Sequence, residues 1–194
     1  MKKLYMLFLI IFMCVNCNGE SKKMSETEID IIFQALITQD AEFEIQANKI
    51  LDERIKKYHL KNDYATKLQL LISMQEYNTA YALTEELAQQ YPTYDEILTI
   101  QCVLAKKLLS VEQSKIVFTE TIKKLNQIES KEESKSFSLK SNQLLLAILY
   151  SDDDLKDQFL GEIINEDFSE YEKKIVEEVI ILSESELYEI FGVY

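Results

Sequence analysis

The sequence contains few of the residues that interrupt regular structure. Its 194 residues include one proline and three glycines. Both residue types mark turns and loops, so their scarcity argues against a fold built of many short elements joined by tight turns. The apolar residues recur at helical spacing rather than in alternation. Together these features predict an all-α fold.

Residues that carry catalysis or bind metals are also scarce. His59 is the only histidine, which excludes a three-histidine zinc site, and it falls at a predicted helix end, where we expect a surface role rather than catalysis. Of the three cysteines, Cys102 lies in an apolar helical stretch, where it is expected to be a small buried hydrophobe rather than a nucleophile. The chain has no glycine-rich phosphate loop and no nucleophile elbow. We therefore expect no enzyme activity, no cofactor and no metal site.

One acidic run invites a calcium interpretation. It comprises Asp152, Asp153 and Asp154, followed by Asp157 and Glu162. The run lacks the glycine and the alternating ligand spacing of an EF-hand loop. Because it follows Ser151, we expect its acids in the first turn of a helix, where the helix dipole favours negative charge.

The charge balance is strongly acidic and uneven. The chain has 21 basic and 34 acidic residues, a net charge of −13. Such a surface repels phosphate backbones, so nucleic acid is not an expected partner. Residues 151–194 hold 14 acidic residues against three lysines. This segment is either a solvated face or an acidic docking surface for a basic partner.

The first residues resemble a bacterial lipoprotein signal. Lys2 and Lys3 precede an apolar run over 4–15 and then Cys17. That run is too short to cross a bilayer, which takes roughly 20 residues. The resemblance implies removal of residues 1–16, lipidation of Cys17 and a tether over 17–24, with the protein anchored in the cell envelope. The alternative is cleavage after Gly19, which would give a soluble secreted or periplasmic protein.

Helix starts are signalled by serine or threonine followed three residues later by an acid or amide. These candidate capping boxes begin at Ser25, Thr93, Ser110, Ser151 and Ser183. A charged, serine-rich stretch over 129–136 predicts a loop. The expected helices cover 26–38, 40–58, 62–74, 78–90, 94–109, 112–128, 137–150, 152–164 and 167–182, with a short turn from 184.

The helix expected over 167–182 has the clearest apolar stripe in the chain. We expect this stripe to contain Phe168, Tyr171, Ile175, Val179 and Leu182.

Residues 62–92 resemble one tetratricopeptide repeat, and residues 94–128 repeat its layout more loosely. The resemblance implies a single domain over 25–194, an α-solenoid of about four helical hairpins with a C-terminal capping helix. A compact helical bundle is the alternative. The residues implied to pack the repeat are Leu68, Leu71, Tyr77, Ala80, Leu87 and Pro92.

These features predict a non-enzymatic adaptor, anchored to a membrane, that binds a protein or peptide in the cell envelope. By analogy with the repeat, Tyr64, Lys67 and Gln101 are expected to line its binding groove. The alternative is an inhibitory or immunity-type lipoprotein whose acidic C-terminal face neutralises a basic toxin or enzyme. The sequence leaves the partner and the oligomeric state open.

Overall fold

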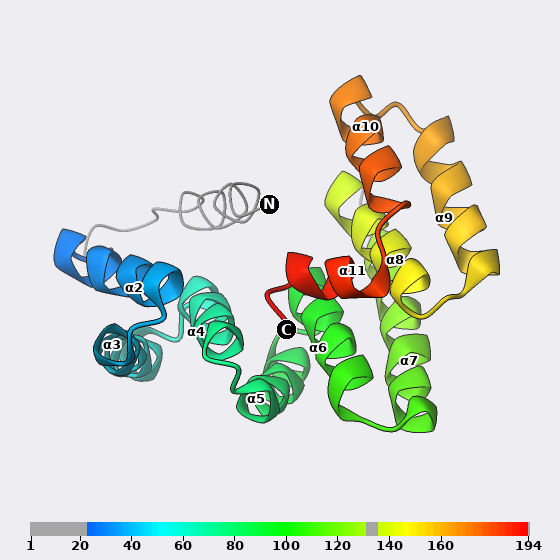
Figure 1. Ribbon diagram of the computed structural model, residues 1–194. Coiled ribbons are helices and arrows are strands. Elements are labelled where there is room, and N and C mark those ends of the chain that lie inside the picture. The colour runs from blue at the N-terminus through cyan, green and yellow to red at the C-terminus, as the bar shows by residue number, and fades with distance from the viewer. Residues whose placement is uncertain (1–22, 131–135, 194) are drawn as a thin grey trace. The chain divides into compact units, whose positions relative to one another are not determined.

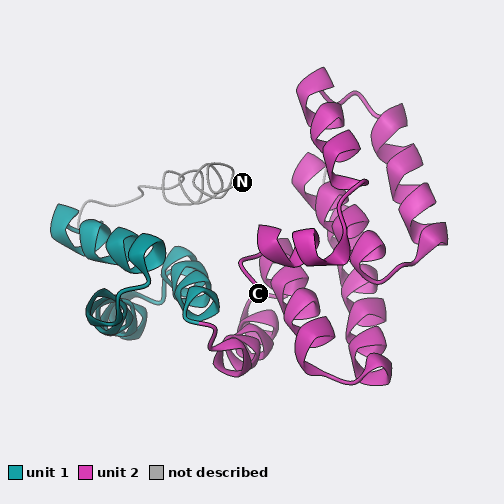
Figure 2. Cartoon of the chain, viewed as in Figure 1, with its two compact units in different colours: residues 1–74 teal, residues 75–194 magenta. Residues whose placement is uncertain are grey.

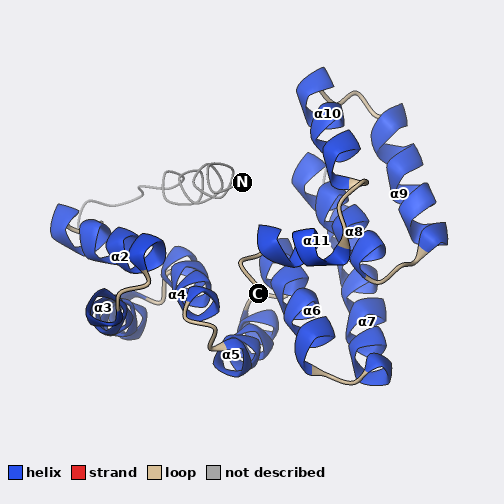
Figure 3. Ribbon diagram, viewed as in Figure 1, coloured by secondary structure: helices blue, strands red, loops and turns tan. Residues whose placement is uncertain are grey.

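The structure, a computed structural model, describes residues 23–130 and 136–193 (Figure 1). Within these residues the chain forms ten helices and no strand, as Figure 3 shows. The predicted all-α class is therefore confirmed. The expected signal over 1–16 and the lipidation site Cys17 lie outside the described residues.

The chain divides into two compact units, residues 1–74 and residues 75–194 (Figure 2). The sequence predicted one domain over 25–194. The described part of unit 1 contains α2 (Glu26–Thr38), α3 (Ala41–Tyr58) and α4 (Lys61–Ser73). Each of these three helices packs against the other two. Unit 1 is thus a small three-helix cluster.

The core of unit 1 is built from one apolar face of each helix. Ile32 and Ala35 of α2, Ala47 and Leu51 of α3, and Leu70 of α4 are fully buried together. The pairs within α2 and α3 are three and four residues apart, the spacing that places side chains on one helix face. The small side chains of Ala35 and Ala47 let α2 and α3 approach closely.

Unit 2 is arranged around a central helix. The helix α8 contacts α6, α7, α9, α10 and α11, and α10 also packs against α9 (Figure 1). The helices α5, α6 and α7 follow one another with close packing between neighbours. Unit 2 contains α5 (Tyr77–Gln90), α6 (Asp95–Leu108), α7 (Val111–Glu129), α8 (Phe137–Leu149), α9 (Asp153–Asn165), α10 (Glu170–Val179) and α11 (Glu184–Ile190).

Three of the predicted capping boxes are confirmed. Ser25, Ser110 and Ser183 each accept a hydrogen bond from the backbone N–H three residues on, and the side chain of that residue accepts from the cap's own N–H. Each box therefore satisfies two backbone groups that a helix start leaves without a partner. These caps fix where α2, α7 and α11 begin.

Two of the predicted caps are wrong. The helix α6 begins after Tyr94, which makes no side-chain cap bond, so Thr93 caps nothing. The helix α9 begins after Asp152, whose Oδ1 accepts from the Leu155 N–H at 3.1 Å. Ser151, the predicted cap, instead takes a left-handed conformation with φ of 54° and completes the reversal from α8. Aspartate supplies the same acceptor as serine one residue later.

A further capping box starts α10 and displaces the predicted apolar stripe. Ser169 and Glu172 form this box, so the helix begins at Glu170 rather than at 167. Val176 is the buried residue of α10, whereas Tyr171, expected on the stripe, is 69% exposed. Phe168 precedes α10 and Leu182 follows it, so the helix carries only the middle of the predicted stripe, in which Ile175 and Val179 are half-buried.

Candidate functional site

We take an open surface cleft in unit 2 as the candidate site. It lies between α7 and the turn that joins α8 to α9, and its volume is about 430 Å³. Lys115, Phe118 and Thr119 line it from α7. The run from Tyr150 to Asp154 lines it from the turn and the start of α9. Two helices and a turn therefore build a site whose walls differ in character.

One wall of the cleft is aromatic. The rings of Phe118 and Tyr150 stack with their centroids 4.5 Å apart and their planes 11° from parallel. The Tyr150 hydroxyl donates to the carbonyl oxygen of Cys102 at 2.9 Å, which holds the ring against α6. Burial raises the pKa of Tyr150, so the phenol stays a neutral donor. The wall is thus a fixed aromatic surface, with Tyr150 partly exposed.

Lys106 supports this wall from behind. Its Nζ lies 5.1 Å from the centroid of the Tyr150 ring and donates to the carbonyl oxygen of Leu149. It also lies 3.5 Å from Oε1 of Glu184 at the start of α11. A single lysine of α6 therefore joins the end of α8 to the C-terminal helix and makes a cation–π contact with the Tyr150 ring.

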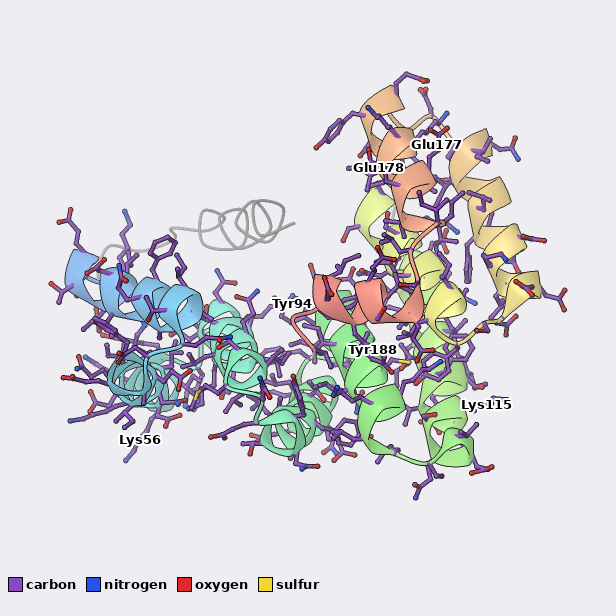
Figure 4. The ribbon with its side chains drawn as sticks, viewed as in Figure 1. Lys56, Tyr94, Lys115, Glu177, Glu178 and Tyr188 are labelled. Atoms are coloured by element: carbon purple, nitrogen blue, oxygen red, sulfur yellow. The ribbon has the colours of Figure 1, made fainter. Side chains whose placement is uncertain are left out.

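The residues that line the cleft after Ser151 are acidic. Asp152 caps α9, and Asp153 pairs with Lys156 at 2.5 Å. Asp154 is exposed in the first turn of the same helix. The predicted position at a helix start is confirmed for Asp152, Asp153 and Asp154, whereas Asp157 and Glu162 lie further along α9. Lys115 faces the cleft from α7 and is exposed; Figure 4 labels it.

The two units differ sharply in charge. Residues 1–74 hold ten basic and ten acidic residues, whereas residues 75–194 hold 11 basic and 24 acidic residues. Unit 2 therefore carries the entire net charge of −13. An aromatic wall beside carboxylates in such a unit suits a cationic side chain, because a cation gains from both the ring face and the negative charge.

A buried ion network lies on α8, and no sequence pattern marks it. Lys140 is 3% exposed, and its Nζ lies 2.6 Å from Oε1 of Glu129 and also contacts Glu162. Burial alone lowers the pKa of Lys140, but the bonds from the two glutamates outweigh it and the pKa is raised. The network joins α7, α8 and α9. We assign this network a structural role, since Lys140 pairs with both carboxylates.

The residues expected to line a groove fall in different units. Tyr64 and Lys67 belong to α4 of unit 1, and Gln101 belongs to α6 of unit 2. Tyr64 is 7% exposed. Lys67 donates to Oδ1 of Asn48 at 2.6 Å and pairs with Asp52 at 3.0 Å. In unit 1, therefore, Tyr64 is buried by packing and Lys67 is engaged in polar contacts within the unit.

The expected repeat spans the boundary between the units, because α4 closes unit 1 and α5 opens unit 2. Leu68 and Leu71 are buried in unit 1, and Ala80 and Leu87 are buried in unit 2. Tyr77 starts α5, and the Nζ of Lys107 lies 5.1 Å from its ring centroid. Pro92 lies in the turn after α5, so α5 ends before it, as expected of proline.

The cysteine and the histidine that were considered for catalysis both have structural roles. Cys102 is fully buried, and burial raises the pKa of its thiol to about 12, so it is not the thiolate that a nucleophile requires. His59 follows α3 in a left-handed conformation, and its N–H donates to the carbonyl oxygen of Ile55. Both predictions, a buried cysteine and a histidine at a helix end, are confirmed.

Within residues 23–130 and 136–193, no group of three or more His, Cys, Asp or Glu side chains is placed to hold a metal ion. In the same part of the chain, no helix is both long enough and apolar enough to cross a membrane. No protein-family model, curated protein or solved structure matches this chain.

Proposed function

We propose that the protein is a non-enzymatic binding module of the bacterial cell envelope, anchored through a lipid at Cys17, and that unit 2 binds a basic segment of a partner protein. We infer a basic partner from the cleft of unit 2, which contains a stacked aromatic pair and aspartates. The anchor rests on the sequence of the first 17 residues. A stack of tetratricopeptide-like hairpins remains our proposed architecture, at the level of sequence resemblance.

The charge of unit 2 supports a basic partner. Carboxylates spread over 75–194 give long-range attraction that steers a basic protein, while the cleft supplies a local contact. A guanidinium suits the cleft, because it pairs with carboxylates and also packs against the exposed part of the Tyr150 ring. Arginine side chains are therefore the preferred ligands.

A second candidate function is neutralisation of a basic toxin or enzyme, and the concentration of all net charge in unit 2 favours it. The two functions differ in which groups are needed. Partner binding that depends on Asp153 and Asp154 but not on other acids of 151–194 would support the cleft, whereas equal dependence on acids throughout 151–194 would support neutralisation.

The test of the site is a titration of the mature protein with a hexa-arginine peptide, followed by amide shifts in nuclear magnetic resonance spectra. We expect the largest shifts at Thr119 and over Ser151–Asp154. We also expect affinity to fall steeply between about 50 mM and about 300 mM salt, since exposed charges are screened. A hexa-glutamate peptide should give no shifts there.

A matched pair of variants separates the cleft from general acidity. Asp153→Asn/Asp154→Asn removes two charges at the cleft, and Glu177→Gln/Glu178→Gln removes two exposed charges on α10 (Figure 4). The first variant should weaken hexa-arginine binding about tenfold, and the second by much less. Equal losses of affinity in the two variants would mean that the peptide responds to the overall charge of unit 2 and that the cleft is not the binding site.

A further inference from the structure

The cleft of unit 2 contains two charges of opposite sign that do not neutralise each other. Lys115 lines it from α7 and Asp154 lines it from α9, and both are exposed. In the part of the chain that the structure describes, neither side chain forms an ion pair or a hydrogen bond. The cleft therefore offers a ligand a free ammonium group and a free carboxylate.

The other two aspartates of the cleft have partners within α9. Asp152 accepts a hydrogen bond from the N–H of Leu155 at 3.1 Å and so caps the helix. Asp153 pairs with Lys156 at 2.5 Å. Each of these carboxylates is thus partly compensated before any ligand arrives. Asp154 is the carboxylate most available to a ligand cation.

Lys115 lies on the face of α7 that forms the cleft. It precedes Phe118 and Thr119 by three and four residues, the spacing that places side chains on one helix face. The Thr119 hydroxyl donates to the carbonyl oxygen of Lys115 at 2.9 Å. A hydroxyl oxygen that donates in this way still has lone pairs with which to accept. This face of α7 therefore provides a cation and a hydrogen-bond acceptor.

We propose that the cleft selects an arginine followed two residues later by an acidic residue, within the basic segment of the partner. The inference rests on the proposed function and names the ligand of the same cleft. The guanidinium pairs with Asp154 and packs against the exposed part of the Tyr150 ring, while the acidic side chain pairs with Lys115. In an extended segment, side chains two residues apart point to the same side, so both enter the cleft together.

Lys115 makes the cleft discriminate among basic segments. The net negative charge of unit 2 attracts any basic segment, whatever the order of its residues. A second cation placed beside Lys115 meets a like charge and is disfavoured, whereas a carboxylate at that place gains an ion pair. Lys115 is thus the residue that determines specificity, and the long-range charge of unit 2 determines the rate of encounter.

The first experiment compares two peptides of identical composition by amide-shift titration of the mature protein at about 150 mM salt. Both are blocked at their ends and contain one arginine, one glutamate, two lysines and several glycines. The paired peptide has the glutamate two residues after the arginine, and the rearranged peptide has it at the far end. We expect the paired peptide to bind about fivefold more tightly, since it alone pairs with Lys115. Equal affinities would overturn the proposal.

Reversing the charge at Lys115 gives a sharper test. A third peptide, the lysine peptide, has lysine in place of the glutamate of the paired peptide. The affinity for the paired peptide divided by that for the lysine peptide should fall about tenfold in Lys115→Glu. Lys123→Glu changes the net charge equally on the same helix, at an exposed position outside the cleft, and should change this ratio much less. Equal changes in the two variants would show that Lys115 acts only through overall charge, and the proposal would be wrong.

A carboxylate beside an arginine can also come from the end of a chain. An unblocked peptide that ends in arginine tests this source, and we expect it to bind more weakly than the paired peptide. Tighter binding would mean that the cleft recognises a chain terminus and would overturn the internal acidic residue.

Hexa-arginine separates this inference from the proposed function. If hexa-arginine shifts no amide of the cleft, the proposed function falls and the inference falls with it. If hexa-arginine binds at the cleft but the paired and rearranged peptides bind equally, the cleft remains the site for a basic segment and only the selection by Lys115 is contradicted.

Discussion

Arg54 Nε lies 3.2 Å from Oδ1 of Asp63, so a buried ion pair joins the last turns of α3 to the first turn of α4. The two side chains are 8% and 2% exposed. Burial raises the pKa of Asp63, although Arg54 acts to lower it. The second oxygen of Asp63 has no hydrogen-bond partner in the structure. This pair is therefore costly to bury, and it is sensitive to the loss of either member.

Removing Arg54 alone should destabilise the protein. Arg54→Met leaves a buried carboxylate without its cation, and we expect a loss of about 3 kcal/mol in the free energy of unfolding at neutral pH. The double variant Arg54→Met/Asp63→Leu should recover most of this loss, since an apolar pair fills the same space. Urea unfolding of the three proteins measures both values. A double variant as unstable as the single one would contradict this account of the pair.

The loss in Arg54→Met should shrink as the pH falls. The pKa of Asp63 in the folded protein is raised, so its protonated form is favoured by folding and its contribution to stability is greatest below the unfolded pKa. That contribution is lost as the pH rises through the folded value. Unfolding measured from neutral pH down toward the ordinary carboxyl pKa should therefore show wild type and variant converging. Parallel curves would mean that Asp63 does not carry the effect.

Lys140 should matter at high pH. Its pKa is raised in the folded protein, because its bonds to Glu129 and Glu162 outweigh burial. Its stabilising contribution is thus fully present below the unfolded lysine pKa and is lost as the pH rises through the folded value. Lys140→Met should cost about 2 kcal/mol at neutral pH and less above that window. Thermal unfolding of both proteins across this range, compared by difference, tests the prediction.

The caps give a prediction with an internal control. Ser110→Ala should cost about 1 kcal/mol, because Ser110 caps α7. Thr93→Ala should cost little, since α6 has no side-chain cap. Sequence alone predicts equal effects, because both residues match the capping pattern. Chemical denaturation of the two variants decides between the two expectations.

The Cys102 thiol should be unreactive in the folded protein. It is fully buried with a pKa raised to about 12, so neither access nor ionisation favours attack at neutral pH. Alkylation followed by peptide mass spectrometry should modify Cys102 only at the rate of unfolding. Rapid modification under native conditions would show that α6 opens locally.

The course of the helices could be predicted from the sequence because their signals are local. Capping boxes and apolar spacing act within a few residues, and the expected ranges agree with α2 to α9 to within about one residue at each end. The start of α10 was missed because apolar Phe168 precedes its true cap, Ser169. The start of α9 moved one residue because aspartate and serine are both good caps.

The contacts that connect helices could not be predicted in the same way. Lys140 reads as an ordinary surface lysine, and only the packing of α7 and α9 around α8 buries it between two glutamates. The cleft likewise joins Phe118 to Tyr150, residues that the sequence does not mark as neighbours. The break between the units after Met74 falls inside the stretch that most resembles one repeat.

The most direct test of the central claim is the intact mass and membrane partition of the protein made by a bacterial host, beside a Cys17→Ser variant. We expect a chain that begins at Cys17, carries a lipid-sized mass increase and partitions with membranes, and we expect the variant to lack the added mass. A soluble chain that begins near Glu20 would contradict the anchor and leave a secreted helical protein in its place.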